Sequence, residues 1–544
     1  MKKNKLLLVL AAFVVALFVL AACDNDEPVA ETPTEAGETP TQAVVDDPTD
    51  PADDGDEIVL TIHYHAGANG VFDEDWPVWR EIAERTGVRL TGTANPIADN
   101  AQEQFNLEAV DQFPADIYAG PGLGDLFRQY GQEGAFQPLN DLIAQYAPNI
   151  RAFLDERPDI ENFLMAPDGN IYFIPNIQDG FVTYTMFMRT DWLDELGLDQ
   201  PDTFEEFEAA LFAFRDEMPA LTGNDVVFPF FADSWMHMMR MIPMFGARGL
   251  SGDTGQRIIL SEDDVMYHGW ITDEFMTAIQ GLSRWYDEGL IDPQIFTRGG
   301  TSRQEMLSQN MGGVTIHWPV STAAFNAQLR DDIEGFRFEA IQPVIGLDGE
   351  RVTEAMRTAP TNTGWGISHN NQHPEATMRM MDFLFSEEGR VLLSFGIEGE
   401  TWEMVNGERV FMDYVHEHDM PATNFLRTRG GLRWLGWRAF FEHEMALASP
   451  EALQAFEIMN NADLYTRQTP SLAFNAAERA AIDDIQSNLN AFLDENIQAM
   501  ILNPWEDVEG RWESFVQEAI AMGAHELVEA FQSAFDRFQE NFGN

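Results

Sequence analysis

The chain has 544 residues, of which 91 are acidic and 32 are basic, so its formal net charge is −59 at pH 7. A hydrophobic content of 45%, with 12% aromatic residues, is enough to bury substantial cores, which excludes disorder of the whole chain and suggests more than one domain. Phosphate binding needs a basic face, so we expect no nucleic acid partner.

The N-terminus has the pattern of an export signal. Three lysines precede a long apolar run in residues 1–22, which is typical of a signal peptide. Ala21 and Ala22 lead into Cys23, the single cysteine of the chain, and this arrangement resembles a bacterial lipobox in which the thiol is acylated. An incidental cysteine behind an uncleaved membrane anchor is the alternative. In either case we expect the body on the outer face of the cytoplasmic membrane, because lysines precede the apolar run and acids follow it.

An acidic segment follows the cysteine. Residues 24–57 carry 13 acids and neither a basic nor an aromatic residue, so they cannot bury enough apolar surface to fold. We expect residues 23–57 to be a disordered tether that begins at the lipidated cysteine. Beyond residue 22 the chain has 29 arginines, 91 acids and no lysine, a net charge of −62. Codon bias or an alkaline or saline habitat would each explain this composition.

Alternating β-rich and helical stretches begin at residue 58. Residues 58–65 read as a strand, residues 73–90 contain a helix that ends at Gly87, and the same order recurs from the strand at 113–120. Alternation of this kind predicts a parallel α/β sheet with a cleft at the C-terminal ends of its strands.

Helices dominate the chain after residue 203. Helices are expected at 203–221, 273–291, 373–396 and almost continuously over 476–543, with strands at 312–318 and 361–368. The sequence contains no tandem repeat.

Several ordered blocks resemble one protein family. They are DGNIYFIPN (168–176), MRTDWLDELGLDQPDTFEEFEAALFAFRDEMP (188–219), WYDEGLIDPQIF (285–296), SEEGRVLLSFGIEGETWEMVNG (386–407) and the C-terminal stretch from Trp505. The chain resembles the family-1 extracellular solute-binding lipoproteins of ABC importers, in the long subgroup with alginate- and oligosaccharide-binding members. The resemblance implies the α/β type II periplasmic-binding-protein fold, in which two α/β lobes joined by a hinge enclose a ligand cleft. Lobe 1 would hold 58–178 and 355–398, and lobe 2 would hold 179–354 and 399–544.

The resemblance also implies a function. We expect a monomeric, non-catalytic binding protein without a cofactor that captures an oligosaccharide, with or without uronate groups, by hinge closure. It would deliver this ligand to ABC permease subunits whose ATPase is a separate protein, since the chain has no GxxxxGK[ST] motif. An oligopeptide-binding lipoprotein and a secreted glycoside hydrolase are the alternatives, although no GxSxG motif or recognisable catalytic acid pair is present.

Candidate ligand residues come from strand ends and aromatic side chains, because sugars pair with flat rings and planar hydrogen-bonding groups. Trp318, at the end of a strand, and Tyr184, between the lobes, are implied by the resemblance. The other candidates in this group are His65, Asn69, Tyr118, Gly120, Asn362 and Trp365. Packing in the core is the alternative for each aromatic residue.

Four arginines and two tryptophans gather in FLRTRGGLRWLGWRAFF, residues 425–441. On a helix, Arg433 and Trp437 would share a face and Trp434 would lie about 100° from Arg433. This pattern suits a sugar stacked on an indole with a carboxylate held by a guanidinium, so these three residues are candidates for a uronate site. A surface helix whose arginines pair with nearby acids is the alternative.

The sequence predicts no metal site. His63 and His65, like His416 and His418, supply too few ligands for zinc, and solvated surface is the expected setting for both pairs. Family members often have a calcium loop after the DWLDELGL block, but residues 218–227 here read MPALTGNDVV, which lacks most of the oxygen ligands. We therefore expect no calcium at this loop.

Overall fold

The computed structural model describes residues 57–66, 70–97, 101–180, 182, 184–252, 255–354, 356–357, 360–418, 420, 422–503 and 508–542. The predicted signal peptide, Cys23, nearly all of the predicted tether and Asn69 lie outside these residues.

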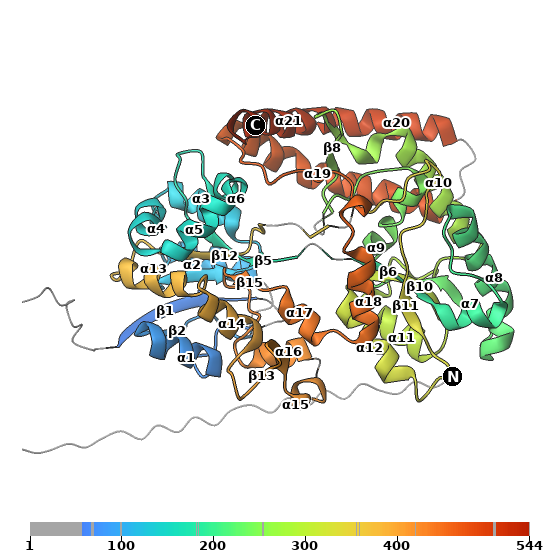
Figure 1. The fold of residues 1–544 in the computed structure, drawn as a ribbon. Coiled ribbons are helices and arrows are strands. Elements are labelled where there is room, and N and C mark those ends of the chain that lie inside the picture. Colours follow the sequence, from blue (N-terminus) through green and yellow to red (C-terminus); the bar gives the residue numbers. More distant parts are fainter. Residues whose placement is uncertain are drawn as a thin grey trace, which may run out of the picture. The chain divides into compact units, whose positions relative to one another are not determined.

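The first sheet has five strands in the order β2-β1-β3-β12-β4. These strands are β1 (Ile58–Tyr64), β2 (Val88–Gly92), β3 (Ile117–Gly120), β4 (Ile174–Pro175) and β12 (Gly364–Ile367). Figure 1 labels β1, β2 and β12 of this sheet. β1 pairs in parallel with β2 and β3, whereas β12 runs antiparallel to β3 and β4. The sheet is therefore mixed, because the chain returns to it as β12 after building a second sheet.

Helices pack around this first sheet. They are α1 (Pro77–Thr86), α2 (Ala101–Val110), α3 (Gly124–Gln132), α4 (Asn140–Tyr146), α5 (Pro148–Glu156), α6 (Pro158–Leu164), α13 (Pro374–Phe383) and α14 (Glu387–Phe395). α1 begins with a proline in its first turn and ends where Gly87 adopts a positive φ of 69°, as the sequence predicts. Its buried face carries Val78, Trp79 and Ile82.

The second sheet has four strands in the order β11-β6-β10-β7. They are β6 (Thr185–Arg189), β7 (Phe228–Phe230), β10 (Gly312–His317) and β11 (Phe338–Ala340). β10 runs parallel to β7 and antiparallel to β6. The last residue of β10, His317, is followed directly by Trp318, so this tryptophan stands at the C-terminal end of a central strand.

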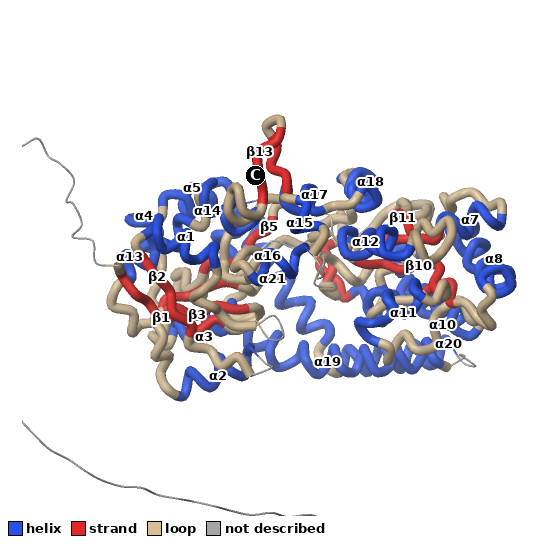
Figure 2. The backbone as a smooth tube through the Cα atoms, turned by 90° about the horizontal axis from the view of Figure 1, so that it is seen from below, coloured by secondary structure: helices blue, strands red, loops and turns tan. Residues whose placement is uncertain are grey.

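Helices also pack around the second sheet. They are α7 (Thr190–Leu196), α8 (Phe204–Thr222), α9 (Trp235–Met239), α10 (Asp273–Asp287), α11 (Ser302–Ser308), α12 (Pro319–Leu329), α18 (Pro450–Met459), α19 (Ala476–Leu502), α20 (Val508–Ala521) and α21 (Ala524–Phe542). Thr203 and Glu206 form a capping box at the start of α8, so the threonine of the TFEE block caps this helix. Figure 2 shows α19 as the long helix that follows α18.

A group of short helices and strands lies along the chain between α14 and α18. It contains β13 (Trp402–Val405), β14 (Glu408–Phe411), α15 (Asp413–His416), α16 (Ala422–Thr428), β15 (Arg438–Ala439) and α17 (Glu442–Leu447). β15 pairs in parallel with β5 (Ile177–Gln178), and Leu435, Trp437 and Ala439 belong to the core of the first sheet. Residues 435–439 therefore pack with lobe 1, whereas the sequence placed everything after 398 in lobe 2.

The chain consequently connects the two lobes three times. The first connection runs from β5 to β6, the second from β11 to β12, and the third from α17 to α18. Separate buried cores belong to the two sheets, and residues 55–544 form one compact unit. This is the α/β architecture that the sequence predicts.

Candidate functional site

A cavity of about 660 Å³ lies beside the first two connections. Cavities of this size hold small ligands in many proteins. Its wall includes residues 177–180 of the first connection, residues 356–357 and 360–362 of the second, and residues 468–472 and 474 ahead of α19. Four arginines and three aspartates contribute to the wall: Arg128, Arg157, Arg357, Arg479, Asp125, Asp159 and Asp179.

Asp125 is the point where several of these groups meet. Arg128 donates to its carboxylate at 2.6 Å, the amide of Asn362 donates at 2.8 Å, and Arg479 lies 3.3 Å away. Burial would raise the pKa of Asp125, but the charges of Arg128 and Arg479 hold that pKa below its ordinary value. The wall therefore presents cationic and amide donors around an ionised carboxylate.

Two aromatic rings stand at one end of the paired strands β6 and β10, Tyr184 directly before β6 and Trp318 directly after β10, and neither lines the large cavity. The rings of Tyr184 and Trp318 have their centroids 5.1 Å apart and are inclined at 47°. Both side chains are half-buried. Arg240 lies over the Tyr184 ring at 4.6 Å, and Arg357, which also lines the cavity, lies 5.5 Å from the Trp318 ring. A pair of partly exposed rings beside guanidinium groups can stack on a sugar and hold its polar substituents.

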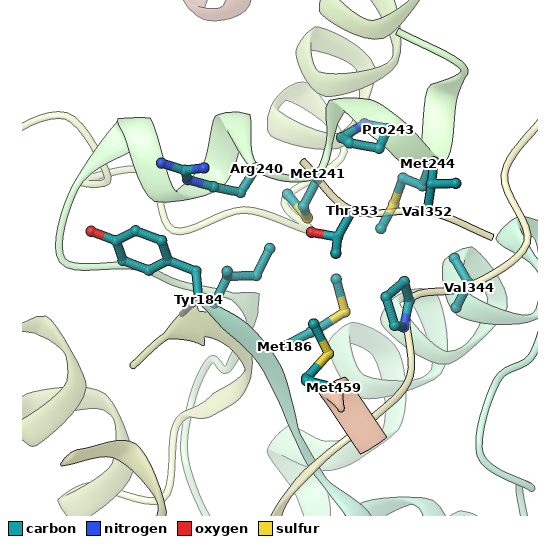
Figure 3. Close-up of a pocket in the computed structure, with 12 residues that line it drawn as sticks. Tyr184, Met186, Arg240, Met241, Pro243, Met244, Val344, Val352, Thr353 and Met459 are labelled. Carbon is teal, nitrogen blue, oxygen red and sulfur yellow. The ribbon is translucent and has the colours of Figure 1, made fainter. Parts of the chain in front are cut away.

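A small second cavity of about 40 Å³ lies behind Tyr184 (Figure 3). Methionines contribute much of its wall: Met186, Met241, Met244 and Met459. Val344 and Thr353, from the second connection, also line it. Methionine side chains adapt to irregular spaces, so the wall behind Tyr184 can adjust to small movements of the ring.

Two histidines support the aromatic pair. The His237 ring lies 5.0 Å from both the Tyr184 and His317 rings, and His317 Nε2 lies 3.4 Å from the carboxylate of Asp233. Burial lowers the pKa of His237 to about 4 and that of His317 to about 2. Both imidazoles are therefore neutral at physiological pH. Arg303 donates to the same Asp233 oxygen at 2.8 Å and balances its charge.

Comparison with known proteins decides the family. The model of the bacterial extracellular solute-binding protein family matches residues 60–391. The chain belongs to this family. The prediction from the sequence blocks is thereby confirmed.

Relatives and solved structures extend this comparison. The solute-binding protein is 24% identical over 342 residues to the fructooligosaccharide ABC transporter substrate-binding protein FusA of Streptococcus pneumoniae, covering 59% of this chain and 60% of FusA. It is 25% identical over 279 residues to the polygalacturonan/rhamnogalacturonan-binding protein YtcQ of Bacillus subtilis, covering 49% and 52%. These matches thus span between about half and 60% of the curated relatives.

A solved structure covers more of the chain. The crystal structure of alginate-binding protein AlgQ2 without calcium ion is 34% identical, with a TM-score of 0.78, and covers 88% of this chain and 98% of AlgQ2. The predicted fold class, two α/β lobes of the periplasmic solute-binding type, is confirmed by this likeness.

Of the residues predicted for ligand contact, three lie at the aromatic pair or the large cavity described above. Tyr184 and Trp318 form the aromatic pair, and Asn362 lines the large cavity. His65 lies at the end of β1, only 2% exposed. A side chain on Gly120 would approach the carbonyl oxygen of His65 to 2.7 Å, so this glycine permits close packing of two loops.

Three predicted aromatic residues lie in the core of the first sheet. Tyr118 is fully buried, donates its hydroxyl to Glu108 at 2.9 Å and stacks on His63. Trp365 is also fully buried, and its indole donates to the carbonyl of Gly436 at 2.9 Å. Trp437 is 2% exposed. In this structure these rings are packing groups, which is the alternative that the sequence left open.

Residues 425–441 do not form one helix, so the helical arrangement considered for Arg433, Trp434 and Trp437 is wrong. α16 ends at Thr428, and the chain then turns through Gly430, Leu432 and Gly436 with positive φ values of 92°, 49° and 85°. Arg433 is buried, donates to the carbonyl of Arg427 at 2.7 Å and lies over the ring of Trp76 at 4.2 Å.

Two further indoles of this segment are held locally. The Trp434 ring is half-buried beside Arg427, at 5.0 Å. The Trp437 indole donates to the carbonyl of Arg433 at 2.7 Å. This segment therefore packs against lobe 1, and none of Arg433, Trp434 and Trp437 lines the large cavity.

The expected setting of one histidine pair was also wrong. His63 and His65 are buried, at 3% and 2% exposure, whereas His416 and His418 are exposed as predicted. Burial lowers the pKa of His63 to about 4. Within the described residues, no group of three or more metal-ligating side chains is placed to hold a metal ion.

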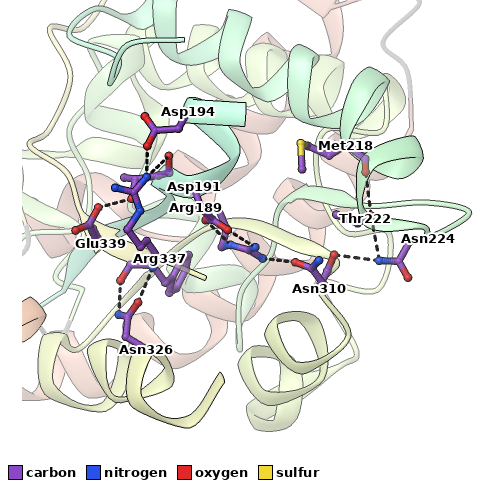
Figure 4. A network of polar contacts seen from close by, with 12 residues as sticks. Arg189, Asp191, Asp194, Met218, Thr222, Asn224, Asn310, Asn326, Arg337 and Glu339 are labelled. Carbon is purple, nitrogen blue, oxygen red and sulfur yellow. Dashed lines mark hydrogen bonds and ion pairs between the residues drawn. The ribbon is translucent and has the colours of Figure 1, made fainter. Parts of the chain in front are cut away.

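The loop in place of the family's calcium loop is closed by an amide (Figure 4). Asn224 donates to the carbonyls of Gln309 and Asn310 at 3.1 and 3.0 Å and to the hydroxyl of Thr222 at 3.2 Å. Arg189, paired with Asp191, donates to the side chain of Asn310 at 2.6 Å. Side-chain hydrogen bonds thus hold the loop to the turn before β10.

Sequence inspection missed the arginines of the cavity. Arg128 and Arg157 each have an aspartate within three positions, which is the ordinary pattern of a surface ion pair. Arg357 pairs with Glu444, far away in sequence, so no local signal marks it. Among the described helices, none is long and apolar enough to cross a membrane.

Proposed function

We propose that this protein captures an oligosaccharide and delivers it to an ABC permease whose ATPase is a separate subunit. The observation that carries the proposal is the Tyr184–Trp318 pair beside a cavity lined by four arginines. Rings of this kind stack on the apolar faces of sugars, and guanidinium groups bind hydroxyls and carboxylates. Family membership and the named functions of FusA, YtcQ and AlgQ2 support a carbohydrate ligand.

The cavity favours a ligand that carries carboxylates. The chain is strongly acidic, with a net charge of −59, so an anionic ligand needs local cations at its site. Four guanidinium groups against three carboxylates on the wall supply such a region. A uronate-containing oligosaccharide fits both the rings and the arginines.

The mechanism we propose is closure of the two lobes about their three connections. A ligand that touches Trp318 in lobe 2 and Asn362 in lobe 1 binds the closed arrangement better and shifts the population toward it. The protein acts as a non-catalytic monomer, held on the outer face of the cytoplasmic membrane by a lipid on Cys23. Metabolic labelling with an alkyne fatty acid, compared between wild type and Cys23→Ser, tests the anchor.

Calorimetric titration tests the ligand. Purified residues 58–544 are titrated with alginate tetrasaccharide, tetragalacturonate, the neutral sugar kestose and a tetrapeptide. We expect binding of at least one uronate oligosaccharide without release of new reducing ends. Binding of the peptide alone would support an oligopeptide carrier instead, and new reducing ends would indicate a glycoside hydrolase.

A further inference from the structure

The three connections between the lobes meet at one arginine. Arg357 lies in the second connection, and its Nη1 donates to the carbonyl of Asp179, in the first, at 3.1 Å. Its Nη1 and Nη2 donate to the two carboxylate oxygens of Glu444 at 2.8 and 2.9 Å, and Glu444 lies on α17 just before the third connection. Arg357 is only 8% exposed. Its guanidinium is therefore fixed by one partner on the first connection and by one on α17, the helix from which the third connection starts.

The network continues into lobe 1 through Asp179. Arg390 on α14 donates to the Asp179 carboxylate at 2.6 Å, and Arg438 on β15 donates to it at 2.9 Å. Two arginines of lobe 1 therefore hold the start of the first connection through the Asp179 carboxylate. A movement of one lobe against the other must rearrange this network or rotate around it.

The same guanidinium lies against the ligand platform. The Arg357 Cζ atom is 5.5 Å from the ring of Trp318, a cation–π distance. Trp318 belongs to lobe 2, where its ring lies beside that of Tyr184. The indole thus contacts both a ring of its own lobe and a cation that lies in the second connection and is bonded to the first connection and to α17.

We propose that Arg357 is a positioning residue that orients the Trp318 indole and couples its position to the three connections between the lobes. Resting on the proposed function, this inference explains how stacking of a sugar on Trp318 would be stronger in one arrangement of the lobes than in the other. A ligand changes a conformational equilibrium only through such a difference in affinity.

A second arginine in the same setting provides a matched control. Arg189 donates to both carboxylate oxygens of Asp191 at 2.8 and 2.6 Å, and its Cζ lies 4.6 Å from the ring of Trp192. It is 1% exposed and lines neither cavity. Arg189→Met therefore removes another buried, carboxylate-paired arginine from a tryptophan that has no place in the proposed site.

The first measurement needs no ligand. In protein labelled with 5-fluorotryptophan, the ¹⁹F resonance of Trp318 is assigned by its loss in Trp318→Phe, and that of Trp192 by its loss in Trp192→Phe. We expect Arg357→Met to broaden or split the Trp318 resonance, because the indole samples more than one orientation, and to leave Trp192 unchanged. Arg189→Met should have the reverse effect. A single sharp Trp318 resonance in Arg357→Met would overturn the proposal.

The second measurement is a double-mutant cycle with alginate tetrasaccharide. We expect Arg357→Met to weaken binding by roughly tenfold in the wild-type background and by less than about twofold in Trp318→Ala, because the arginine acts through the indole. Equal losses in the two backgrounds would contradict the proposal. If Arg357→Met does not fold, Arg357→Lys is used, since lysine keeps the charge but loses the bidentate geometry.

The two measurements separate two failures. Absence of binding of any sugar by the wild type would reject the proposed function, while the ¹⁹F spectra would still decide whether Arg357 positions Trp318. Binding with an unchanged Trp318 resonance in Arg357→Met would keep the proposed function and reject the role of Arg357.

Discussion

The guanidinium of Arg479, in the first turn of α19, lies 3.3 Å from the carboxylate of Asp125 on α3. Asp125 already receives closer bonds from Arg128 and Asn362, so Arg479 is, of the two arginines that bind this carboxylate, the one whose removal leaves it better satisfied. We predict that Arg479→Met weakens binding of tetragalacturonate by roughly tenfold, the loss of one charge-assisted contact, and binding of a neutral sugar by much less. Parallel calorimetric titrations measure both.

Arg433 serves as the control for this prediction. Its sequence pattern suggested a uronate contact, but its side chain bonds the Arg427 carbonyl and packs on Trp76. We expect Arg433→Ala to lower the free energy of unfolding by about 2–3 kcal/mol, through the lost packing and carbonyl partner, and to change uronate and neutral affinities equally. A selective loss of uronate affinity in this variant would restore the original interpretation.

The aromatic pair yields a second prediction. Trp318→Ala removes a partly exposed ring at the end of β10, and we expect a loss of about 2 kcal/mol in binding, or roughly 30-fold in Kd, for any sugar that stacks on it. Trp434→Ala removes a ring of similar exposure outside the cavity and should leave Kd unchanged. Equal effects of the two substitutions on calorimetric Kd would show that Trp318 is not a ligand platform.

The loop closed by Asn224 yields a third prediction. Asn224→Ala removes three hydrogen bonds and should lower the free energy of unfolding by about 1–2 kcal/mol, measured by urea denaturation. Millimolar calcium should raise the melting temperature of neither protein, because residues 218–227 lack most of the oxygen ligands that calcium needs. The exposed neighbour Asp225 is the control: a calcium-dependent rise in melting temperature that Asp225→Ala abolishes would contradict the prediction.

The sequence predicted the order of strands and helices well where hydrophobic periodicity and caps agreed. Gly87 ends α1 and Thr203 begins α8, as their residue types indicate. The helix considered across Arg433 and Trp437 is absent because three glycines interrupt the segment and Leu432 adopts a positive φ of 49°. The glycines argued against a helix, but the four-residue spacing of Arg433 and Trp437 gave the stronger indication of one.

Parts of the candidate site were predictable for a similar reason. Trp318 directly follows a β-rich run, so its place at a strand end could be anticipated. Trp365 and Trp437 have the same residue type but lie in the core, because burial depends on which segments pair in three dimensions. Arg357 acquires its role from Asp179 and Glu444, which are distant in sequence, and no local pattern reveals such a contact.

The carboxyl group of Glu354 yields a prediction on pH. Glu354 lies in the second connection, is 2% exposed, and accepts hydrogen bonds from the backbone amides of Gly249 and Leu250 at 2.9–3.1 Å. Burial raises its pKa from 4.5 to about 7, although these amides and the charges of Arg248 and Arg240 act in the opposite direction. Tyr267, whose pKa is itself raised to about 12 by burial and by the charge of Glu354, is the other titratable group facing it.

The direction of the effect follows from the raised pKa. The folded protein keeps the Glu354 proton to a higher pH than the unfolded chain does, so this group's contribution is complete below pH 4.5 and is lost as pH rises toward 7. We predict that the free energy of unfolding of wild type falls by about 2 kcal/mol relative to Glu354→Gln between pH 5.5 and 8, measured by urea denaturation. Histidines with lowered pKa values act in the opposite direction but are present in both proteins and cancel in the difference. A difference that stays constant over this range would mean that the Glu354 carboxyl is ionised throughout, with its burial offset by the amides of the 249–250 loop.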